Sequence, residues 1–90
     1  MLGARAAAEH SRKLRPFWWD GRILRWPARE GRRKLVLQEV AELFPPGRRF
    51  SEPEVDAILR PVWDDYCQLR RALVDYGWLN RKAGVYWRIG

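Results

Sequence analysis

The segment from Asp64 to Ile89 constrains the fold most, because it reads as a helix, a glycine stop and a β-hairpin in that order. Its apolar side chains recur every three or four residues and therefore share one helical stripe, at Tyr66, Leu69, Leu73 and Tyr76. Gly77 follows at the position where a left-handed residue commonly ends a helix. This order is typical of the end of a winged helix-turn-helix domain.

After the glycine, the residues predict a small hairpin. Trp78 and Leu79 come first, and a polar turn is expected from Asn80 to Gly84. The next strand has the alternating period of a β-strand, with Val85, Trp87 and Ile89 on one side and Tyr86 and Arg88 on the other.

Upstream, a second hairpin is expected within residues 17–26. Asp20 and Gly21 stand between two β-prone runs, and both residues tolerate a positive φ. Pro27 ends this hairpin. A helix is predicted from about Ala28 to Phe44, whose apolar side carries Val36, Leu37, Val40, Leu43 and Phe44.

A second helix is predicted to begin at Ser51, after a minimal strand at residues 48–50. Ser51 and Glu54 form a capping box, and Pro53 falls in the first turn, where its missing N–H costs nothing. Pro61 disfavours helical geometry at the residue before it and so ends the helix. The expected fold is α+β and winged helix-turn-helix-like: three helices, a C-terminal β-hairpin wing and an extra N-terminal hairpin. Residues 1–16 are expected to form a basic Ala/Arg-rich arm and residues 17–90 a single domain.

The composition excludes several classes of site. Cys67 is the only cysteine and His10 the only histidine, so an internal disulfide and a Cys/His metal cluster are excluded. Cys67 is expected to be a small buried residue. Because no nucleophile is paired with a base, we expect the protein to be non-enzymatic and to hold no cofactor and no metal. Without an apolar run long enough to cross a bilayer, or a secretory signal, a cytoplasmic protein is expected.

The net charge is confined to one end of the chain. Residues 1–34 contain ten Arg or Lys against three acids, which gives +7, whereas residues 35–90 contain eight of each sign. A basic surface attracts acidic polymers, above all nucleic acid, so the N-terminal third is the expected contact region.

The third helix is a poor candidate for reading bases. Its outer face would present Asp64, Asp65, Gln68, Arg71, Ala72 and Asp75, and three acids oppose docking on a polyanion. Asp64 and Asp65 are better explained as caps of the helix. Arg71 is the one evident base-contact candidate.

Other cations are expected to contact phosphates. Several lie near the start of the first helix, where they oppose the helix dipole, so helix stability does not explain them. The nucleic-acid set predicted here comprises Arg29, Arg32, Arg33, Lys34, Arg48, Arg49, Arg71, Arg81 and Lys82. The alternative is a solvated face that keeps the protein soluble.

Three tryptophans near the N-terminus, interleaved with Arg22 and Arg25, have more than one interpretation. Trp18, Trp19 and Trp26 could stack on unpaired bases, could form a protein-interaction surface, or could extend a small core, which is the commoner case. A domain of this size buries only about 60 to 65% of its unfolded surface, so it needs such additions or dimerisation.

The residues resemble a bacterial family of unknown function. The resemblance covers residues 17–89 and is carried most distinctively by Leu73-Val74-Asp75-Tyr76-Gly77 with the upstream Leu69-Arg70-Arg71. More diffuse matches lie at Asp20-Gly21-Arg22, Phe50-Ser51-Glu52, Leu79-Asn80-Arg81 and Tyr86-Trp87. It implies a small winged-helix-like domain, found alone or fused to arsenic-repressor-type transcriptional regulators, and it implies no activity.

Together these features predict a DNA-binding transcription regulator or accessory module with backbone-dominated contacts, acting mainly on duplex DNA. One alternative is a protein-interaction or dimerisation module. The other is binding of RNA or single strands by the basic, aromatic N-terminal third.

Overall fold

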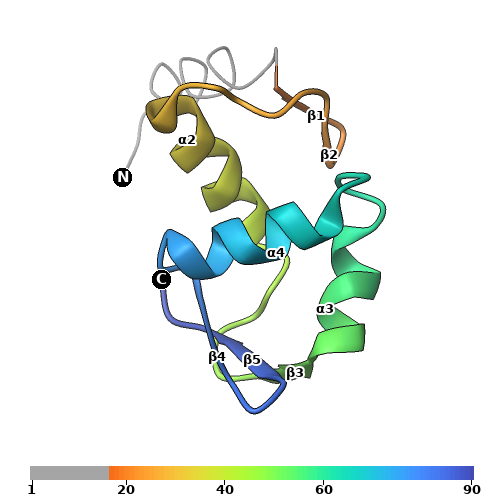
Figure 1. Cartoon of the computed structure of the whole chain (residues 1–90), viewed down its shortest axis with the longest axis vertical. Coiled ribbons are helices and arrows are strands. Elements are labelled where there is room, and N and C mark those ends of the chain that lie inside the picture. Colours follow the sequence, from red (N-terminus) through yellow and green to blue (C-terminus); the bar gives the residue numbers. More distant parts are fainter. Residues whose placement is uncertain (1–16) are drawn as a thin grey trace.

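A computed structural model describes residues 17–90, so the predicted arm at 1–16 lies outside the described part. The described residues form a small α+β fold of three helices and five antiparallel strands (Figure 1). The elements follow the chain as β1 (Trp18–Trp19), β2 (Arg22–Ile23), α2 (Glu30–Ala41), β3 (Arg49–Ser51), α3 (Glu52–Leu59), α4 (Tyr66–Asp75), β4 (Leu79–Lys82) and β5 (Val85–Arg88). The helices thus match the predicted number.

The main sheet has the strand order β3-β5-β4. Its central strand, β5, pairs antiparallel with both neighbours, so Phe50, Tyr86 and Arg81 lie in one row and Arg49, Trp87 and Asn80 in the next. Phe50 and Tyr86 are buried, which turns their row toward the helices. In Figure 1, α4 crosses the middle of the molecule between α2 and this sheet.

The core is a single apolar cluster shared by all three helices and the sheet. Its fully buried side chains include Leu37 and Val40 from α2, Leu59 from α3 and Leu69 and Leu73 from α4. Phe44 and Phe50 close it with an edge-to-face contact at 5.3 Å between ring centroids.

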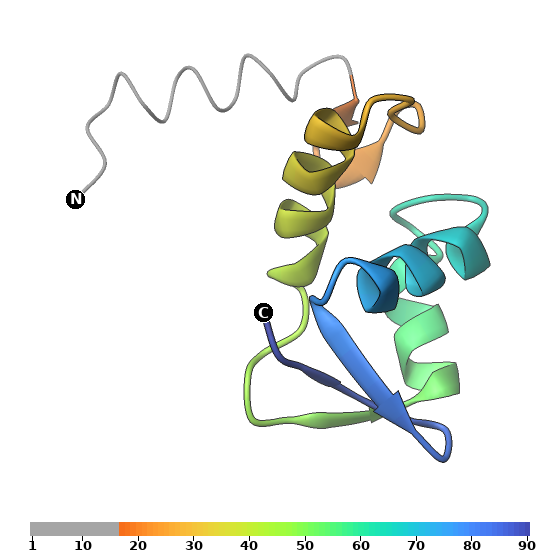
Figure 2. The same cartoon turned by 60° about the vertical axis from the view of Figure 1, so that its left-hand side comes forward.

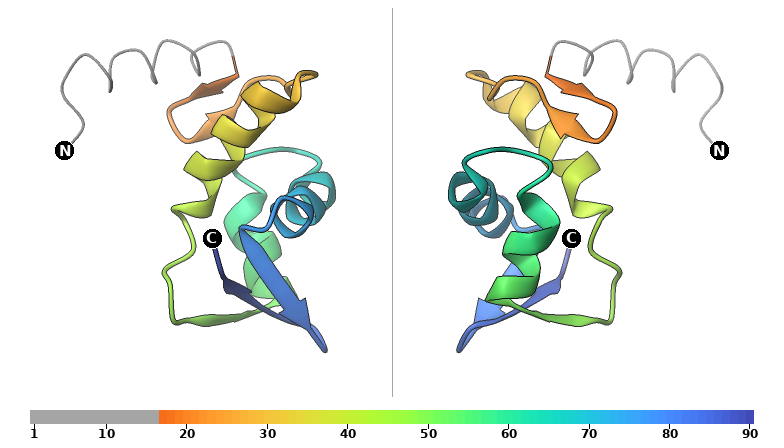
Figure 3. Two further views of the ribbon diagram at one scale, coloured as in Figure 1. Left: turned by 90° about the vertical axis from the view of Figure 1, so that its left-hand side faces the viewer. Right: turned by 90° about the vertical axis from the view of Figure 1, so that its right-hand side faces the viewer.

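The predicted N-terminal hairpin is confirmed, although its strands are only two residues long. Asp20 and Gly21 have φ of 53° and 75°, the conformation that a two-residue hairpin turn needs. Ile23 anchors the hairpin, because its side chain is buried and its N–H donates to the Val62 carbonyl at 2.8 Å. Figure 3 shows the β1–β2 hairpin beside the first turns of α2.

The helix predicted from Ala28 to Phe44 is shorter at both ends. It begins at Glu30, because Arg29 is still extended with φ −86° and ψ 135°. It ends at Ala41, after which the N–H groups of Leu43 and Phe44 bond three residues back in a tighter turn. Leu43 was expected on the apolar side but is exposed, because this tighter turn rotates it away.

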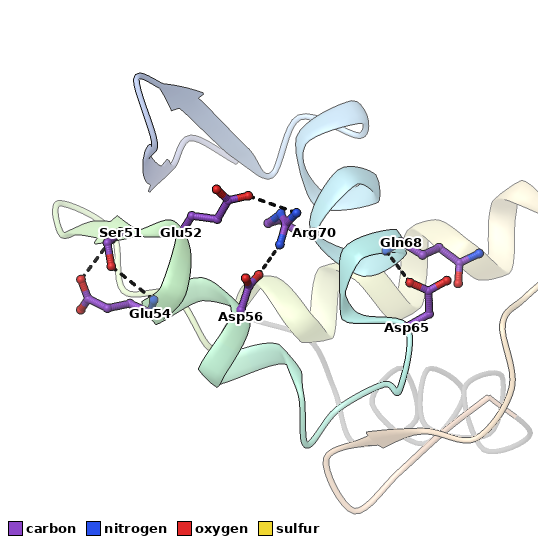
Figure 4. A network of polar contacts seen from close by, with 7 residues as sticks. All are labelled: Ser51, Glu52, Glu54, Asp56, Asp65, Gln68 and Arg70. Atoms are coloured by element: carbon purple, nitrogen blue, oxygen red, sulfur yellow. Dashed lines mark hydrogen bonds and ion pairs between the residues drawn. The ribbon is translucent and has the colours of Figure 1, made fainter.

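The second and third helices begin as predicted. Ser51 and Glu54 form the capping box, with hydrogen bonds of 3.0 and 3.3 Å (Figure 4). Asp65 caps α4 by accepting the Gln68 N–H at 3.0 Å, and Gly77 ends that region with φ 79°. The prediction for Asp64 was wrong: it does not cap the helix but lies 3.8 Å from Arg22 in an exposed ion pair.

The C-terminal hairpin is confirmed with a shorter turn than predicted. β4 continues through Lys82, which pairs with Val85, so only Ala83 and Gly84 form the turn. Both have positive φ, 52° and 77°, which allows a two-residue connection. Figure 2 shows β4 and β5 projecting together to this turn.

Two smaller expectations also need correction. Cys67 is half-buried rather than buried, because it lies at the border of the α4 stripe. Ala72, expected on the outer face, is buried at 8% exposure. No helix among residues 17–90 is long and apolar enough to cross a membrane.

Candidate nucleic-acid interface

Eight of the nine predicted cations fall into two groups at opposite ends of the molecule, and the ninth, Arg71, lies on α4. Figure 1, whose vertical is the longest axis, places the start of α2 near the top and the β4–β5 turn at the bottom. Arg29, Arg32, Arg33 and Lys34 belong to the first group. The second, here called the sheet group, comprises Arg48, Arg49, Arg81 and Lys82. One compact contact therefore cannot involve all of them.

The side chains of Arg29 and Arg32 are exposed and make no polar contact with another described residue. Neither side chain makes a hydrogen bond or an ion pair with another residue of 17–90, and Arg29, at the N-cap, provides no side-chain cap, although its backbone carbonyl accepts the Arg33 N–H at 3.0 Å. Lys34 is 4.0 Å from Glu30 in a solvent-exposed pair, which adds little stability. The side chains of Arg29 and Arg32 are therefore free to meet a ligand, and Lys34 would give up only this exposed pair.

Arg33 differs, because it is half-buried and makes three hydrogen bonds. Its guanidinium donates to the carbonyls of Pro27 and Ala28 at 3.1 and 3.0 Å and to the Tyr76 hydroxyl at 3.0 Å. It thereby ties the segment before α2 to the end of α4. This explains a cation in the first turns of the helix without any ligand.

A hollow of about 460 Å³ lies at the start of α2. The residues that line it are Phe17, Arg25, Trp26, Ala28, Arg29 and Arg32, and no carboxylate is among them. The Arg25 guanidinium lies over the Phe17 ring, 4.9 Å from its centroid. We call this site the arginine hollow. It combines three positive charges with two aromatic rings.

The sheet group is more heterogeneous. Arg48 lies 3.6 Å from Glu54 and over the Phe50 ring, and Arg49 lies over the Trp87 ring at 5.1 Å. Arg81 and Lys82 are exposed, but as neighbours on β4 they point to opposite faces of the strand. Only part of the group can face one surface.

The outer face of α4 does not stand free. Asp65, Gln68, Arg71, Ala72 and Asp75 line a second hollow of about 410 Å³ together with Trp26, Arg33 and Tyr76. Gln68 is further engaged, since its carbonyl accepts a hydrogen bond from the Trp63 indole at 2.9 Å. Two acids against two arginines make this hollow nearly neutral.

The three N-terminal tryptophans do not form one surface. Trp18 and Trp26 are half-buried and pack against the core, and Trp26 lies 6.1 Å from Trp63 between ring centroids. Trp19 is 59% exposed. The core-extending interpretation therefore fits Trp18 and Trp26 but not Trp19.

Sequence reasoning missed a largely buried cation on α4, Arg70. The Arg70 side chain is 13% exposed and bridges Glu52 at 3.1 Å and Asp56 of α3 (Figure 4). Partial burial alone would lower its pKa, but the hydrogen bond and charge of Asp56 and the charge of Glu52 raise the pKa above its usual value. The sequence did contain a signal for this network, because Glu52 and Asp56 are four residues apart and so share one face of their helix.

Residues 22–88 match the profile of a family described as an uncharacterized protein conserved in bacteria, DUF2087. The chain belongs to this family. Comparison with curated proteins and with solved structures finds no match. The resemblance inferred from the residues is thus confirmed at the level of an uncharacterised bacterial family. The fusion to arsenic-repressor-type regulators stays a prediction.

The DUF2087 match covers most of the arginine hollow. It begins in β2 and therefore includes Arg25, Trp26, Arg29 and Arg32, whereas Phe17 precedes it. The family description names no activity, so function has to be argued from the side chains.

Proposed function

We propose that this DUF2087 domain is a non-enzymatic, winged-helix-like module that binds duplex DNA mainly through the phosphate backbone, as a transcription regulator or its accessory. The order helix, strand, helix, helix, hairpin and the sheet order β3-β5-β4 support the winged-helix assignment. In that assignment β4 and β5 form the wing.

The observation that carries the proposal is the arginine hollow. Arg25, Arg29 and Arg32 are exposed around one concave surface, and no described carboxylate lines it. The Arg25 guanidinium lies over the Phe17 ring, but those of Arg29 and Arg32 give up no hydrogen bond or ion pair with residues 17–90 when they neutralise phosphates, and counterion release then favours binding. Arg49 and Lys82, whose rows lie on the same face of the sheet, would extend the contact at the other end of the domain.

Sequence discrimination by α4 has a minor part in this proposal. Arg71 is its one base-contact candidate, and Asp65 and Asp75 line the same hollow. Arg33 is left out of the contact set, because all its hydrogen bonds described above hold the fold together. Contacts to phosphates fix a protein on a duplex without reading its sequence, so weak sequence preference is expected.

The test is the affinity for a duplex of random sequence, measured by fluorescence anisotropy at several salt concentrations. We expect affinity to fall steeply with salt, and the change of Arg29 and Arg32 to Gln to weaken binding at low salt. Arg60→Gln is the matched control, because Arg60 is exposed and lies over the Tyr66 ring away from the hollow. Undetectable binding at low salt, or equal loss in the control, would overturn the proposal.

A second candidate function rests on two exposed apolar side chains near the N-terminal hairpin. Trp19 is 59% and Leu24 is 54% exposed, and such side chains can anchor a protein partner or a second copy. In this case Trp19→Ser would dissociate a dimer or complex that light scattering detects in the wild type. A monomer at all concentrations would count against the homodimer.

A further inference from the structure

We infer that the arginine hollow also binds a nucleoside monophosphate group, a phosphate monoester joined to a planar base. The phosphate would lie among Arg25, Arg29 and Arg32, with the base against Phe17 or Trp26. The group could come from a free mononucleotide or from the phosphorylated end of an unpaired strand. The inference goes beyond the proposed function, because a duplex interior offers neither a monoester nor a free base.

The charge of the hollow fits a monoester better than a backbone phosphate. An internal phosphodiester carries one negative charge, whereas a terminal phosphate monoester approaches two at neutral pH. Three guanidinium groups around one hollow, with no lining carboxylate, match the more highly charged group. Guanidinium forks also pair with phosphate oxygens in a bidentate geometry.

The aromatic lining adds a surface for a base. Phe17 and Trp26 lie in the hollow with the arginines, and bases stack on aromatic rings without regard to their identity. Trp26 is supported by its tilted contact with Trp63. The volume of about 460 Å³ lies within the range of about 300 to 1,000 Å³ that small-molecule pockets occupy.

The backbone around the hollow is held in place before any ligand binds. The Leu24 N–H donates to the Phe17 carbonyl at 2.7 Å, which keeps the two ends of the hairpin together. Arg33 holds the carbonyls of Pro27 and Ala28 at the other side. Because the lining residues come from these fixed segments, little ordering of the backbone is needed on binding, and the ordering cost falls on the arginine side chains.

The hollow differs from its neighbour in a way that provides a control. Trp26 lines both hollows, but the second one also contains Asp65 and Asp75. Arg71 lies in that second hollow and is exposed. Arg71→Gln therefore removes the same charge as Arg32→Gln, but at a nearly neutral site that should attract a dianion much less.

The experiment is isothermal titration of the full chain with adenosine monophosphate, adenosine and inorganic phosphate. We expect adenosine monophosphate to bind with an affinity about 5- to 150-fold higher than that of inorganic phosphate, which is the contribution of one stacked base. Arg32→Gln and Arg29→Gln should each weaken it by about tenfold or more, as expected for a lost charged hydrogen bond. Arg71→Gln should change it by less than about twofold, since a surface charge outside the site acts weakly.

Three results of this titration would overturn the inference: no binding of the monophosphate at millimolar concentration, equal affinity for inorganic phosphate, or equal weakening by Arg71→Gln. Unpaired oligonucleotides with and without a 5′-phosphate identify the source. A phosphorylated strand that binds more tightly than the monophosphate assigns the site to strand ends, and equal affinity assigns it to the free nucleotide. Strands that bind equally with and without the phosphate would also overturn the inference. A wild-type protein that binds the monophosphate but does not bind duplex DNA would refute the proposed function and leave this inference intact.

Discussion

Arg33 on α2 donates a hydrogen bond of 3.0 Å to the hydroxyl of Tyr76, which ends α4. The two residues are 43 positions apart in the chain, and the same guanidinium also holds two carbonyls before α2. Arg33 therefore links the segment before α2 to the end of α4, although it belongs to a basic cluster. Its removal should affect the fold rather than nucleic-acid binding alone.

We expect Arg33→Met to lower the free energy of unfolding by about 1 to 3 kcal/mol, because three hydrogen bonds of a charged donor are lost. Tyr76→Phe, which removes one of them, should cost about 0.5 to 1.5 kcal/mol. Urea denaturation measures both. Arg32→Met is the matched control and should stay within about 0.5 kcal/mol, as most exposed changes do. Equal stability of the Arg33 and Arg32 variants would contradict the structural role.

Arg70 should contribute more to stability than Arg33, because its side chain is 13% exposed and faces two carboxylates. Arg70→Met leaves Glu52 and Asp56 near each other on α3 without a counter-ion. Breaking a fully buried ion pair costs about 3 to 5 kcal/mol, and with Glu52 45% exposed we expect about 2 to 3. The neighbouring Arg71→Met should be nearly neutral. A loss below about 1 kcal/mol, within the usual range of exposed ion pairs, would show that solvent screens the network.

The features that sequence predicts well act over a few residues. Ser51 with Glu54, Asp20 with Gly21, and Gly77 each fix the backbone through their own chemistry, and all were found where the pattern placed them. Local rules of this kind do not depend on what packs nearby.

The features that sequence-based prediction misses depend on contacts between segments that are distant in the chain. Arg33 and Arg70 look like ordinary surface cations until Tyr76 and Asp56 are brought beside them. Likewise Phe17 and Arg32 line one hollow only because the hairpin folds against α2. Charge counting therefore located the basic third of the chain, but it could not separate its structural arginines from its free ones.

Glu54 predicts a pH dependence of stability. Hydrogen bonds from the Ser51 backbone and side chain, with the charge of Arg48, lower the pKa of Glu54 below 4.5 in the folded state. A lowered folded pKa stabilises the protein above the unfolded pKa, and this contribution is lost as pH falls through the folded value. The stability advantage of wild type over Glu54→Gln should therefore shrink below about pH 4.5, near the ordinary pKa of Glu. If the free energies of unfolding of the two proteins changed in parallel with pH across that range, the predicted role of Glu54 would be contradicted.

The salt dependence of duplex binding should identify the free arginines individually. Each phosphate neutralised contributes about 0.9 to the slope of the logarithm of affinity against the logarithm of salt concentration. Because Arg29 and Arg32 have no partners among residues 17–90, their change to Gln should reduce that slope by about 1 each and about 2 together. Arg60→Gln should leave the slope unchanged, since its guanidinium lies over the Tyr66 ring. Weaker binding with an unaltered slope would mean that the two arginines act through the fold, and a slope reduced as much by Arg60→Gln would mean that net charge alone governs affinity.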